Sequence, residues 1–358
     1  MKSIAIVNGA RPNDGITYGL LPYYMALKKA SYNVVWYQII NLPGDSCPVT
    51  EAKCLVGKYC FNYELSNGLN RLIFLRGKVK VIKEDIIILS DPTLLTLFDD
   101  FSKIVVKIHD FRPLSKYGDK FLTRLMFHFV KRKLKKVKSA IFTTSFVENE
   151  ALHLGISPIN KFLIPDPVLM CEEPQKHIET SLKKINLGSI TVTYIAADRP
   201  YKNIDFFLAI SNEFSNLKRF QFLLLSKVSK ERLSYIRNNF KNVTILTGVD
   251  DIRQIYERTD IVIYPTLYEG FGRPVIEAMS FGIPIIATDL EPIRENGEGS
   301  VILCSENDIR CWRENILNLC DTNNYLEKSL KSLKRFEYFS PLRFEERVYQ
   351  MINILSNK

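Results

Sequence analysis

The chain lacks several signals that mark common classes of protein. No apolar stretch approaches the roughly 18 residues needed to span a bilayer, and the first residues do not combine a long apolar segment with a small-residue cleavage site, as a secretory signal does. No Asp-x-Asp pair occurs anywhere, so a carboxylate clamp for a divalent metal is not expected. We therefore expect a soluble, cytoplasmic protein that holds no metal.

Paired cysteines and histidine clusters are also absent. The seven cysteines are odd in number and form no C-x-x-C motif, and only four histidines occur. Cys47, Cys54 and Cys60 lie close together in the sequence, but no histidine follows them at zinc spacing. We interpret the cysteines as thiols in a reducing compartment, in preference to a disulfide or metal framework.

The composition is that of a globular protein with a surplus of positive charge. Hydrophobic residues make up 46% and charged residues 25% of the 358 residues, and the net charge is +10. Such a surplus suits nucleic acid, an anionic membrane or phosphorylated ligands. No nucleic-acid-binding module or interleaving of basic and aromatic residues is present, so a nucleic-acid partner is not expected.

Short β-branched runs alternate with longer amphipathic segments, which indicates βαβ units and parallel sheets. Helices are expected at 18–29, 205–213, 250–257 and 341–355. The expected strands are nearly continuous apolar runs, as in sheets covered on both faces. They lie at 3–8, 33–39, 86–90, 104–108, 140–144, 191–196, 220–225, 243–246, 260–264 and 284–288.

A proline-containing polar stretch at 164–187 separates two such series. We therefore predict an N-terminal Rossmann-like domain at 1–168 and a second at 169–338. Residues 339–358 are predicted to form a helix that packs back toward the first domain.

The most informative segment, residues 260–289, reads DIVIYPTLYEGFGRPVIEAMSFGIPIIATD. A strand is followed by a glycine-rich turn at Gly270, Phe271 and Gly272, and a helix begins near Pro274, a residue favoured in the first turn. Gly282 is expected to end that helix. Backbone N–H groups at the start of a helix favour an anion, and glycines let a ligand approach closely.

Glu269 and Glu277 flank this turn, and carboxylates repel phosphate. Their expected partners are neutral hydroxyls. Taken alone, Glu269 could equally cap the turn, and Glu277 could equally complement the positive end of the helix dipole.

The run EGFGRPVIEAMSFGIPII resembles the donor-binding segment of retaining GT-B glycosyltransferases, in particular glycosyltransferase family 4. The resemblance implies two Rossmann-like, doubly wound parallel-sheet domains that face each other across a cleft. It also implies that Glu269 contacts the transferred sugar, that Glu277 binds the ribose, and that the amides of residues 270–272 hold phosphate or sugar hydroxyls. The donor would be a nucleotide-diphosphate sugar and no cofactor would be needed.

Three further places carry the same resemblance. Arg199 and Lys202 follow the strand at 191–196, where the family has cations that stabilise the leaving diphosphate; the Arg–Lys spacing is shorter here and the preceding glycine is absent. Gly15 keeps the place of one glycine of the family's first loop, although Asp14 replaces the other. His109 belongs to a His-Asp pair that the family places near the sugar.

The segment at 121–138 predicts a helix with one apolar and one basic face. Its apolar residues are Leu122, Leu125, Met126, Phe129, Val130, Leu134 and Val137, and its cations include Lys131, Arg132, Lys133, Lys135, Lys136 and Lys138. One interpretation is a domain helix with a solvated outer face. The other is peripheral docking on the inner face of an anionic membrane.

The predicted function is therefore metal-independent, retaining transfer of a sugar from a nucleotide-diphosphate sugar to an acceptor hydroxyl of a glycan, lipid-linked or protein-linked acceptor. A sugar phosphorylase or a nucleotide-sugar epimerase on the same architecture is the alternative, because fold does not decide function. Acceptor-binding residues are expected in the loops at 43–70 and 111–120.

Overall fold

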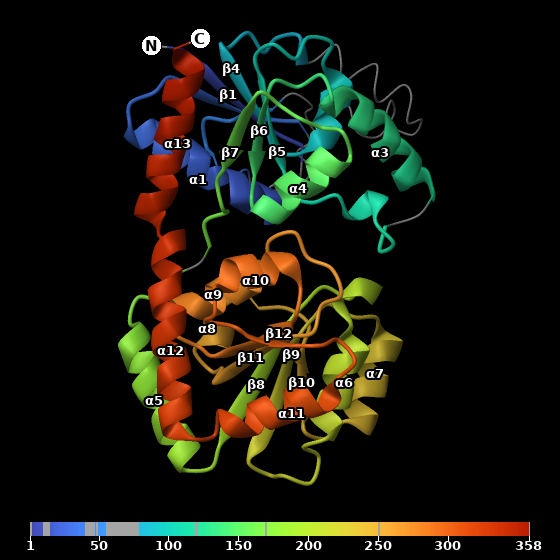
Figure 1. Cartoon of the computed structure of the whole chain (residues 1–358), viewed down its shortest axis with the longest axis vertical. Helices are drawn as coiled ribbons and strands as arrows, with labels where there is room; N and C mark the ends of the chain where they lie inside the picture. Colours follow the sequence, from blue (N-terminus) through green and yellow to red (C-terminus); the bar gives the residue numbers. More distant parts are fainter. Residues whose placement is uncertain are drawn as a thin grey trace. The chain divides into compact units, whose positions relative to one another are not determined.

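The computed structural model describes residues 2–9, 15–39, 47, 49–54, 79–118, 121–168, 170–249 and 251–357. The chain divides into two compact units (Figure 1). Unit 1 comprises Met1–Pro167 together with Pro341–Lys358, and unit 2 comprises Val168–Ser340. No helix in the described ranges is long and apolar enough to cross a membrane.

Unit 1 is built on a seven-stranded parallel sheet of order β3-β2-β1-β4-β5-β6-β7. Alternate residues of each strand face opposite sides: Ile4 and Ile6 pack in one core, and Ala5 and Val7 in the other. Both faces are therefore covered, which explains the continuous apolar runs. The strands are β1 (Ile4–Asn8), β2 (Val34–Gln38), β3 (Lys53–Cys54), β4 (Ile86–Leu89), β5 (Ile104–Ile108), β6 (Ser139–Phe142) and β7 (Asn160–Leu163).

The helices of unit 1 lie on both faces of this sheet. The last helix packs on α1: the rings of Tyr23 and Phe344 meet at 4.8 Å, and the Tyr349 hydroxyl donates to the Ala26 carbonyl at 3.1 Å. The helical elements are α1 (Gly15–Lys29), α3 (Phe121–Leu134), α4 (Ser145–His153), α13 (Pro341–Ser356) and the short turns η1 (Pro92–Leu97) and η2 (Arg112–Leu114).

Unit 2 is a second Rossmann-like unit, with a six-stranded parallel sheet of order β10-β9-β8-β11-β12-β13. The strands are β8 (Ile190–Ile195), β9 (Phe220–Leu225), β10 (Val243–Leu246), β11 (Ile261–Tyr264), β12 (Ile285–Thr288) and β13 (Ile302–Cys304). The helical elements are α5 (Pro174–Asn186), η3 (Pro200–Lys202), α6 (Ile204–Asn212), α7 (Lys230–Asn239), α8 (Arg253–Tyr256), α9 (Arg273–Ser280), α10 (Glu291–Gly297), α11 (Ile309–Asn318), α12 (Thr322–Phe336) and η4 (Glu337–Phe339).

All ten predicted strands are present, with ends within two residues of those expected. Three further strands, β3, β7 and β13, escaped prediction, and each forms an edge of its sheet. Edge strands pair on one side only, so they can be short and partly exposed; β3 (KC) and β13 (ILC) have only two and three residues, and β7 (NKFL) is half polar. We also expected a polar linker to extend to residue 187. This was wrong for its second half, because residues 174–186 form α5, in which Ile178 and Ile185 are buried.

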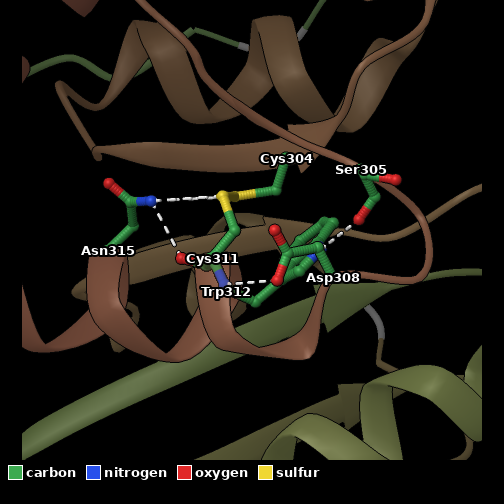
Figure 2. The surroundings of a disulfide bond; sticks show 6 residues. All are labelled: Cys304, Ser305, Asp308, Cys311, Trp312 and Asn315. Carbon is green, nitrogen blue, oxygen red and sulfur yellow. Dashed lines mark hydrogen bonds between the residues drawn. A yellow bond between two sulfur atoms is a disulfide. The ribbon is translucent and has the colours of Figure 1, made fainter.

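The cysteine interpretation was wrong for one pair. Cys304 at the end of β13 is joined to Cys311 in the first turn of α11 by a disulfide (Figure 2). The backbone N–H of Cys311 donates to the Asp308 carboxylate at 3.1 Å, which caps the same helix. A separation of seven residues matches no metal or redox motif, so the spacing of the two cysteines did not predict the disulfide.

Helix α3 does not bury one uniform apolar face. Val130 and Leu134 are buried and Phe127 packs with them, but Leu125 and Phe129 are exposed. The first half of the helix therefore presents apolar side chains to solvent, ahead of the basic residues of its second half.

Candidate functional site

In a parallel sheet, ligands bind outside the carboxyl ends of the strands, where the strand order reverses. In unit 2 this point lies between β8 and β11, which are hydrogen-bonded neighbours although the end of β8 (Ile195) and the start of β11 (Ile261) are 66 positions apart. Lys202 follows β8 and Glu269 follows β11. The topology therefore brings together two residues that are remote in sequence.

Lys202 and Glu269 form the centre of this site. The Lys202 Nζ atom lies 2.6 Å from Glu269 Oε2 and 3.0 Å from the hydroxyl of Tyr264, the last residue of β11. The Tyr264 hydroxyl also donates to Glu269 Oε2. The Lys202 backbone is held by the Tyr194 hydroxyl, which donates to its carbonyl at 2.5 Å. The pair is thus held by tyrosines of two strands, with Tyr264 of β11 on the side chains and Tyr194 of β8 on the Lys202 backbone.

The charges in this cluster are well defined. Burial alone raises the pKa of the Glu269 carboxyl, but the nearby Lys202 ammonium and the hydrogen bonds from Lys202, Tyr264 and the Gly270 amide together lower that pKa below its ordinary value. Burial, followed by the negative charge of Glu269, raises the pKa of Tyr264 well above its ordinary value. Glu269 is therefore an ionised acceptor and Tyr264 a protonated donor at neutral pH.

The turn after Glu269 leads directly into α9. Gly272 precedes the helix with φ +85°, and a Cβ there would lie 2.8 Å from Ile293 Cδ1. The ring of Phe271 is buried against Phe339, and its carbonyl accepts from Asn296 Nδ2 at 2.5 Å. The ring and the carbonyl of Phe271 are therefore both engaged within unit 2.

Glu277 lies in α9, buried to 6% exposure. The Tyr256 hydroxyl donates to its Oε2 at 2.8 Å, and Arg273 Nη2 lies 3.5 Å from its Oε1. The carboxylate is thus held rigidly by α8 and by its own helix. Gly282, with φ +67°, follows the end of α9 as the sequence predicted.

Arg199 is placed differently from Lys202. It precedes η3, its side chain is exposed, and within the described ranges it forms no ion pair. The structure therefore brings Lys202, but not Arg199, into contact with Glu269. An exposed guanidinium on the same loop stays available to a ligand.

Unit 1 holds the remaining predicted residues. His109 follows β5, and its Nε2 lies 3.0 Å from the Ser90 carbonyl oxygen, beyond β4. Gly15 is the first residue of α1, whereas Asp14 and most of the predicted acceptor loop at 43–70 lie outside the described residues. In the part of the chain that is described, no three His, Cys, Asp or Glu residues are grouped to hold a metal.

Sequence reasoning missed two charged residues beside His109. Lys107, within β5, is fully buried, and it pairs with Asp166 near the end of the first segment of unit 1. The sequence did indicate a buried ion pair, because a lysine inside the apolar run IVVKI can be buried only with a partner. Sequence alone does not say which acid supplies it.

Comparisons with known proteins agree with this geometry. Residues 189–322, within unit 2, match the family Glycosyl transferases group 1. The crystal structure of HepE from Anabaena in complex with UDP and glucose superposes with a TM-score of 0.75 at 14% identity, over 99% of this chain and 100% of that one. WaaG, a glycosyltransferase involved in lipopolysaccharide biosynthesis, superposes with a TM-score of 0.70 at 13% identity, over 99% and 100%.

The chain has the GT-B glycosyltransferase fold. This confirms the GT-B architecture that was predicted from the resemblance of the segment at 260–289. Among curated relatives, the O-antigen chain mannosyltransferase RfbU of Salmonella typhimurium is 21% identical over 251 residues, 65% of either protein. O-antigen chain mannosyltransferase B of Escherichia coli is 27% identical over 93 residues, 25% of this chain and 24% of that protein. The chain therefore matches less than two thirds of each relative's length.

Proposed function

We propose that the protein is a retaining glycosyltransferase that moves a sugar from a nucleotide-diphosphate sugar to an acceptor hydroxyl. The observation that carries the proposal is the Lys202–Glu269 contact at the point where the strand order of unit 2 reverses. It places a cation beside a carboxylate at the mouth of a helix, which suits a ligand with both phosphate and hydroxyl groups. The group 1 match over residues 189–322 supports the same conclusion.

Lys202 is the residue proposed to stabilise the leaving diphosphate. Its ammonium group has three N–H donors, two of which are directed to Glu269 and Tyr264. The third is available to a phosphate oxygen, whose negative charge grows as the glycosidic bond breaks. A fixed cation lowers the energy of that transition state more than that of the ground state. Arg199, exposed on the same loop, would supply a second positive charge.

Glu269 and Glu277 are proposed to bind the hydroxyl groups of the donor. Glu269 is ionised and already fixed by two donors, so it can accept from a sugar hydroxyl without reorganising. Glu277 is held by Tyr256 in the body of α9 and would accept from the ribose diol. The Gly270 amide is held by Glu269, and the amides of Phe271 and Gly272 are proposed to bind phosphate at the start of that helix.

Retention of configuration follows from a front-face path, in which the acceptor attacks from the side that the diphosphate leaves. We assign no side chain as a covalent nucleophile, because Glu269 is bound to Lys202 and Tyr264. The test is proton NMR of the product formed with an α-linked donor. An α-linked product agrees with the proposal, and a β-linked product contradicts it.

The proposed reaction needs no metal, since Lys202 and Arg199 supply the positive charge. Turnover should therefore be unchanged after dialysis against EDTA. A loss that added magnesium or manganese restores would contradict metal independence while leaving sugar transfer itself intact.

A glycan or lipid-linked hydroxyl is the proposed acceptor, with α3 docking on an anionic membrane. Phe121 and Phe129 are 77% and 57% exposed and lie on the same helix as the basic residues of its last turn, so apolar insertion and charge attraction would act together. Co-sedimentation with vesicles should require anionic lipid and weaken with salt. Changing both phenylalanines to serine should reduce it, whereas Leu187→Ser, an exposed apolar residue of unit 2, should not. Binding that ignores lipid charge would contradict docking.

The central experiment measures the melting temperature with a panel of uridine, guanosine and adenosine diphosphates and their sugars. One nucleotide series should raise it, by an amount set by its dissociation constant. The same titration on Glu277→Ala should show a weaker rise. If no nucleotide stabilises the protein, the donor assignment is wrong.

A further inference from the structure

A buried side chain from another part of unit 2 holds the backbone of Phe271. Asn296, in the last turn of α10, is 2% exposed, and its Nδ2 atom donates to the Phe271 carbonyl oxygen at 2.5 Å. The ring of Phe271 lies 6.2 Å from the buried ring of Phe339. The carbonyl and the ring are thus both fixed. Within the described residues, the N–H groups of Phe271 and Gly272 form no hydrogen bond.

One arginine of α12 supports both of these contacts. Arg335 Nε donates to the Asn296 carbonyl at 2.7 Å, Nη2 donates to the Glu295 carbonyl at 3.1 Å, and Nη1 pairs with the Glu298 carboxylate. The last carbonyls of a helix have no partner inside it, so a cation placed there satisfies them. The same guanidinium lies 5.3 Å from the ring of Phe339. Arg335 therefore fastens α10 to α12 and keeps Asn296 in place.

The orientation of one peptide group depends on the Asn296 hydrogen bond. The Phe271 carbonyl and the Gly272 N–H belong to the same planar, trans peptide unit, so they point in opposite directions. Fixing the carbonyl toward Asn296 therefore directs the N–H away from it. Glycine adopts both signs of φ at little cost, so Gly272, with φ +85°, would also accommodate this unit rotated by half a turn. That rotation would present a carbonyl in place of an N–H to a ligand.

We propose that Asn296 and Arg335 are positioning residues that direct the Gly272 N–H to a phosphate group of the donor. Backbone N–H groups at the start of a helix bind anions, whereas a carbonyl oxygen in the same place would repel them. Phosphate as the ligand rests on the proposed function; the orientation of the peptide does not. All the residues involved belong to unit 2.

One NMR experiment reports both ends of this peptide. The chain has two Phe-Gly pairs, Phe271–Gly272 and Phe281–Gly282. Labelling phenylalanine carbonyls with ¹³C and glycine nitrogens with ¹⁵N therefore gives two carbonyl–amide correlations, and Phe271→Leu identifies the first by its loss. Each correlation carries the ¹³C shift of the phenylalanine carbonyl and the proton shift of the glycine amide. Gly282 follows the other end of α9 and serves as the internal reference.

The first part of the test uses the protein without ligand. Asn296→Leu removes the donor and keeps a side chain of similar size, so the ¹³C resonance of the Phe271 carbonyl should move upfield as its hydrogen bond is lost. Asn242→Leu is the matched control, because Asn242 Nδ2 also donates to a backbone carbonyl of unit 2, that of Ser211, at 2.7 Å. It should leave the Phe271 resonance unchanged. An unchanged Phe271 resonance in Asn296→Leu overturns the proposal.

The second part adds the nucleoside diphosphate that raises the melting temperature, or the matching nucleoside, which has no phosphate. In wild type the diphosphate should move the Gly272 amide proton downfield, and the nucleoside should not. In Asn296→Leu this response should disappear and the dissociation constant of the diphosphate should rise about tenfold, with that of the nucleoside unchanged. Asn242→Leu should behave as wild type. A merely structural loss would weaken both ligands in both variants, and that result overturns the proposal.

A second variant keeps the proposal testable if Asn296→Leu does not fold. Arg335→Met removes every donor to α10 but keeps an apolar stem, so the Gly272 response and the diphosphate affinity should both fall. Unchanged values overturn the proposal. If the Phe271 carbonyl shifts in Asn296→Leu but no nucleotide binds the wild type, the proposed function fails and the orientation of the peptide stands. If the diphosphate binds and the Gly272 amide of the wild type does not respond, the positioning role fails and the donor site stands.

Discussion

The Nζ atom of Lys202 lies 2.6 Å from Oε2 of Glu269, a contact between residues 67 positions apart. It exists because β8 and β11 are neighbours in the sheet, so that the loops leaving their carboxyl ends meet. Each residue constrains the other: the ammonium group keeps the carboxylate ionised, and the carboxylate holds the ammonium group in place. The site is therefore organised before any ligand binds.

Replacing the cation should remove most of the turnover. In Lys202→Met, kcat should fall roughly 100- to 1,000-fold, the usual loss when one donor to a developing negative charge is removed. Steady-state kinetics with the nucleotide sugar found by thermal shift would measure this. Lys218→Met changes an exposed lysine just before β9, at the amino end of that strand and so away from the site, and should be neutral. Unchanged kcat in Lys202→Met would remove this residue from the mechanism.

The carboxylate of α9 should act mainly on donor affinity. Glu277→Gln keeps the shape of the side chain and an oxygen that can accept from Tyr256. It loses the charge that binds a diol, so the dissociation constant of the nucleotide should rise about tenfold or more. Isothermal titration calorimetry measures that constant. Tyr256→Phe, which removes only the supporting hydroxyl, should have a smaller effect. Equal affinity in Glu277→Gln and wild type would mean that the ribose lies elsewhere.

The glycine ahead of α9 should tolerate no side chain. Gly272→Ala should destabilise the protein, because φ is +85° and the new Cβ would lie 2.8 Å from Ile293 Cδ1. Gly188→Ala is the matched control: its φ is +70°, but no atom lies within 4 Å of a Cβ there. In this control variant the free energy of unfolding should fall by about 1–2 kcal/mol, from backbone strain alone. Urea unfolding should show a larger loss for Gly272→Ala, and equal losses would mean that Ile293 moves away freely.

The disulfide of unit 2 should contribute measurably to stability. Closing so short a loop is worth about 2–3 kcal/mol in the chain-entropy account. Cys311→Ser should therefore lower the melting temperature, and dithiothreitol should lower it in wild type but not in this variant. Cys320→Ser changes a free cysteine that follows the same helix and should have little effect. A wild-type melting temperature that ignores dithiothreitol would contradict a stabilising bond.

Stability should fall on mild acidification because of His177. Burial lowers its pKa below the ordinary 6.5, so the folded state holds this ring neutral. The unfolded chain takes up the proton first as the pH falls. The stability is complete above the unfolded-state pKa and is lost as the pH drops through that value toward the lower folded-state one.

Trp312 fluorescence in a Trp36→Phe background would follow unfolding of unit 2, since the chain has only two tryptophans. The free energy of unfolding should fall between about pH 7.5 and about pH 5. Adding His177→Gln should flatten this dependence, and an unchanged slope would assign the effect to other groups.

The sequence predicts the scaffold well where burial is complete. The central strands are nearly continuous apolar runs because helices cover both faces, so their positions follow from the pattern alone. The positions of Lys202 and Glu269 follow in turn, since each lies in the loop that leaves the carboxyl end of such a strand. The edge strand β7 carries no such pattern: it reads NKFL, and Phe162 is its one buried residue.

Partners contributed from distant segments could not be predicted. The hydroxyls of Tyr264 and Tyr256 hold the two glutamates, yet tyrosines in apolar segments read simply as core residues. The Lys107–Asp166 pair joins a strand to a segment 59 residues later, and many acids could have served. Periodicity reports burial but not which polar groups meet, so pairing of this kind depends on the three-dimensional fold.

The order of segments in the two units has a consequence for synthesis. Unit 2 is one uninterrupted stretch inserted into unit 1, whose last helix, α13, covers α1 through Tyr349 and Phe344. As the chain leaves the ribosome, unit 2 can complete its core before unit 1 can. The face of α1 that α13 covers is thus exposed throughout translation of the inserted unit, and it is the surface a nascent-chain chaperone would meet.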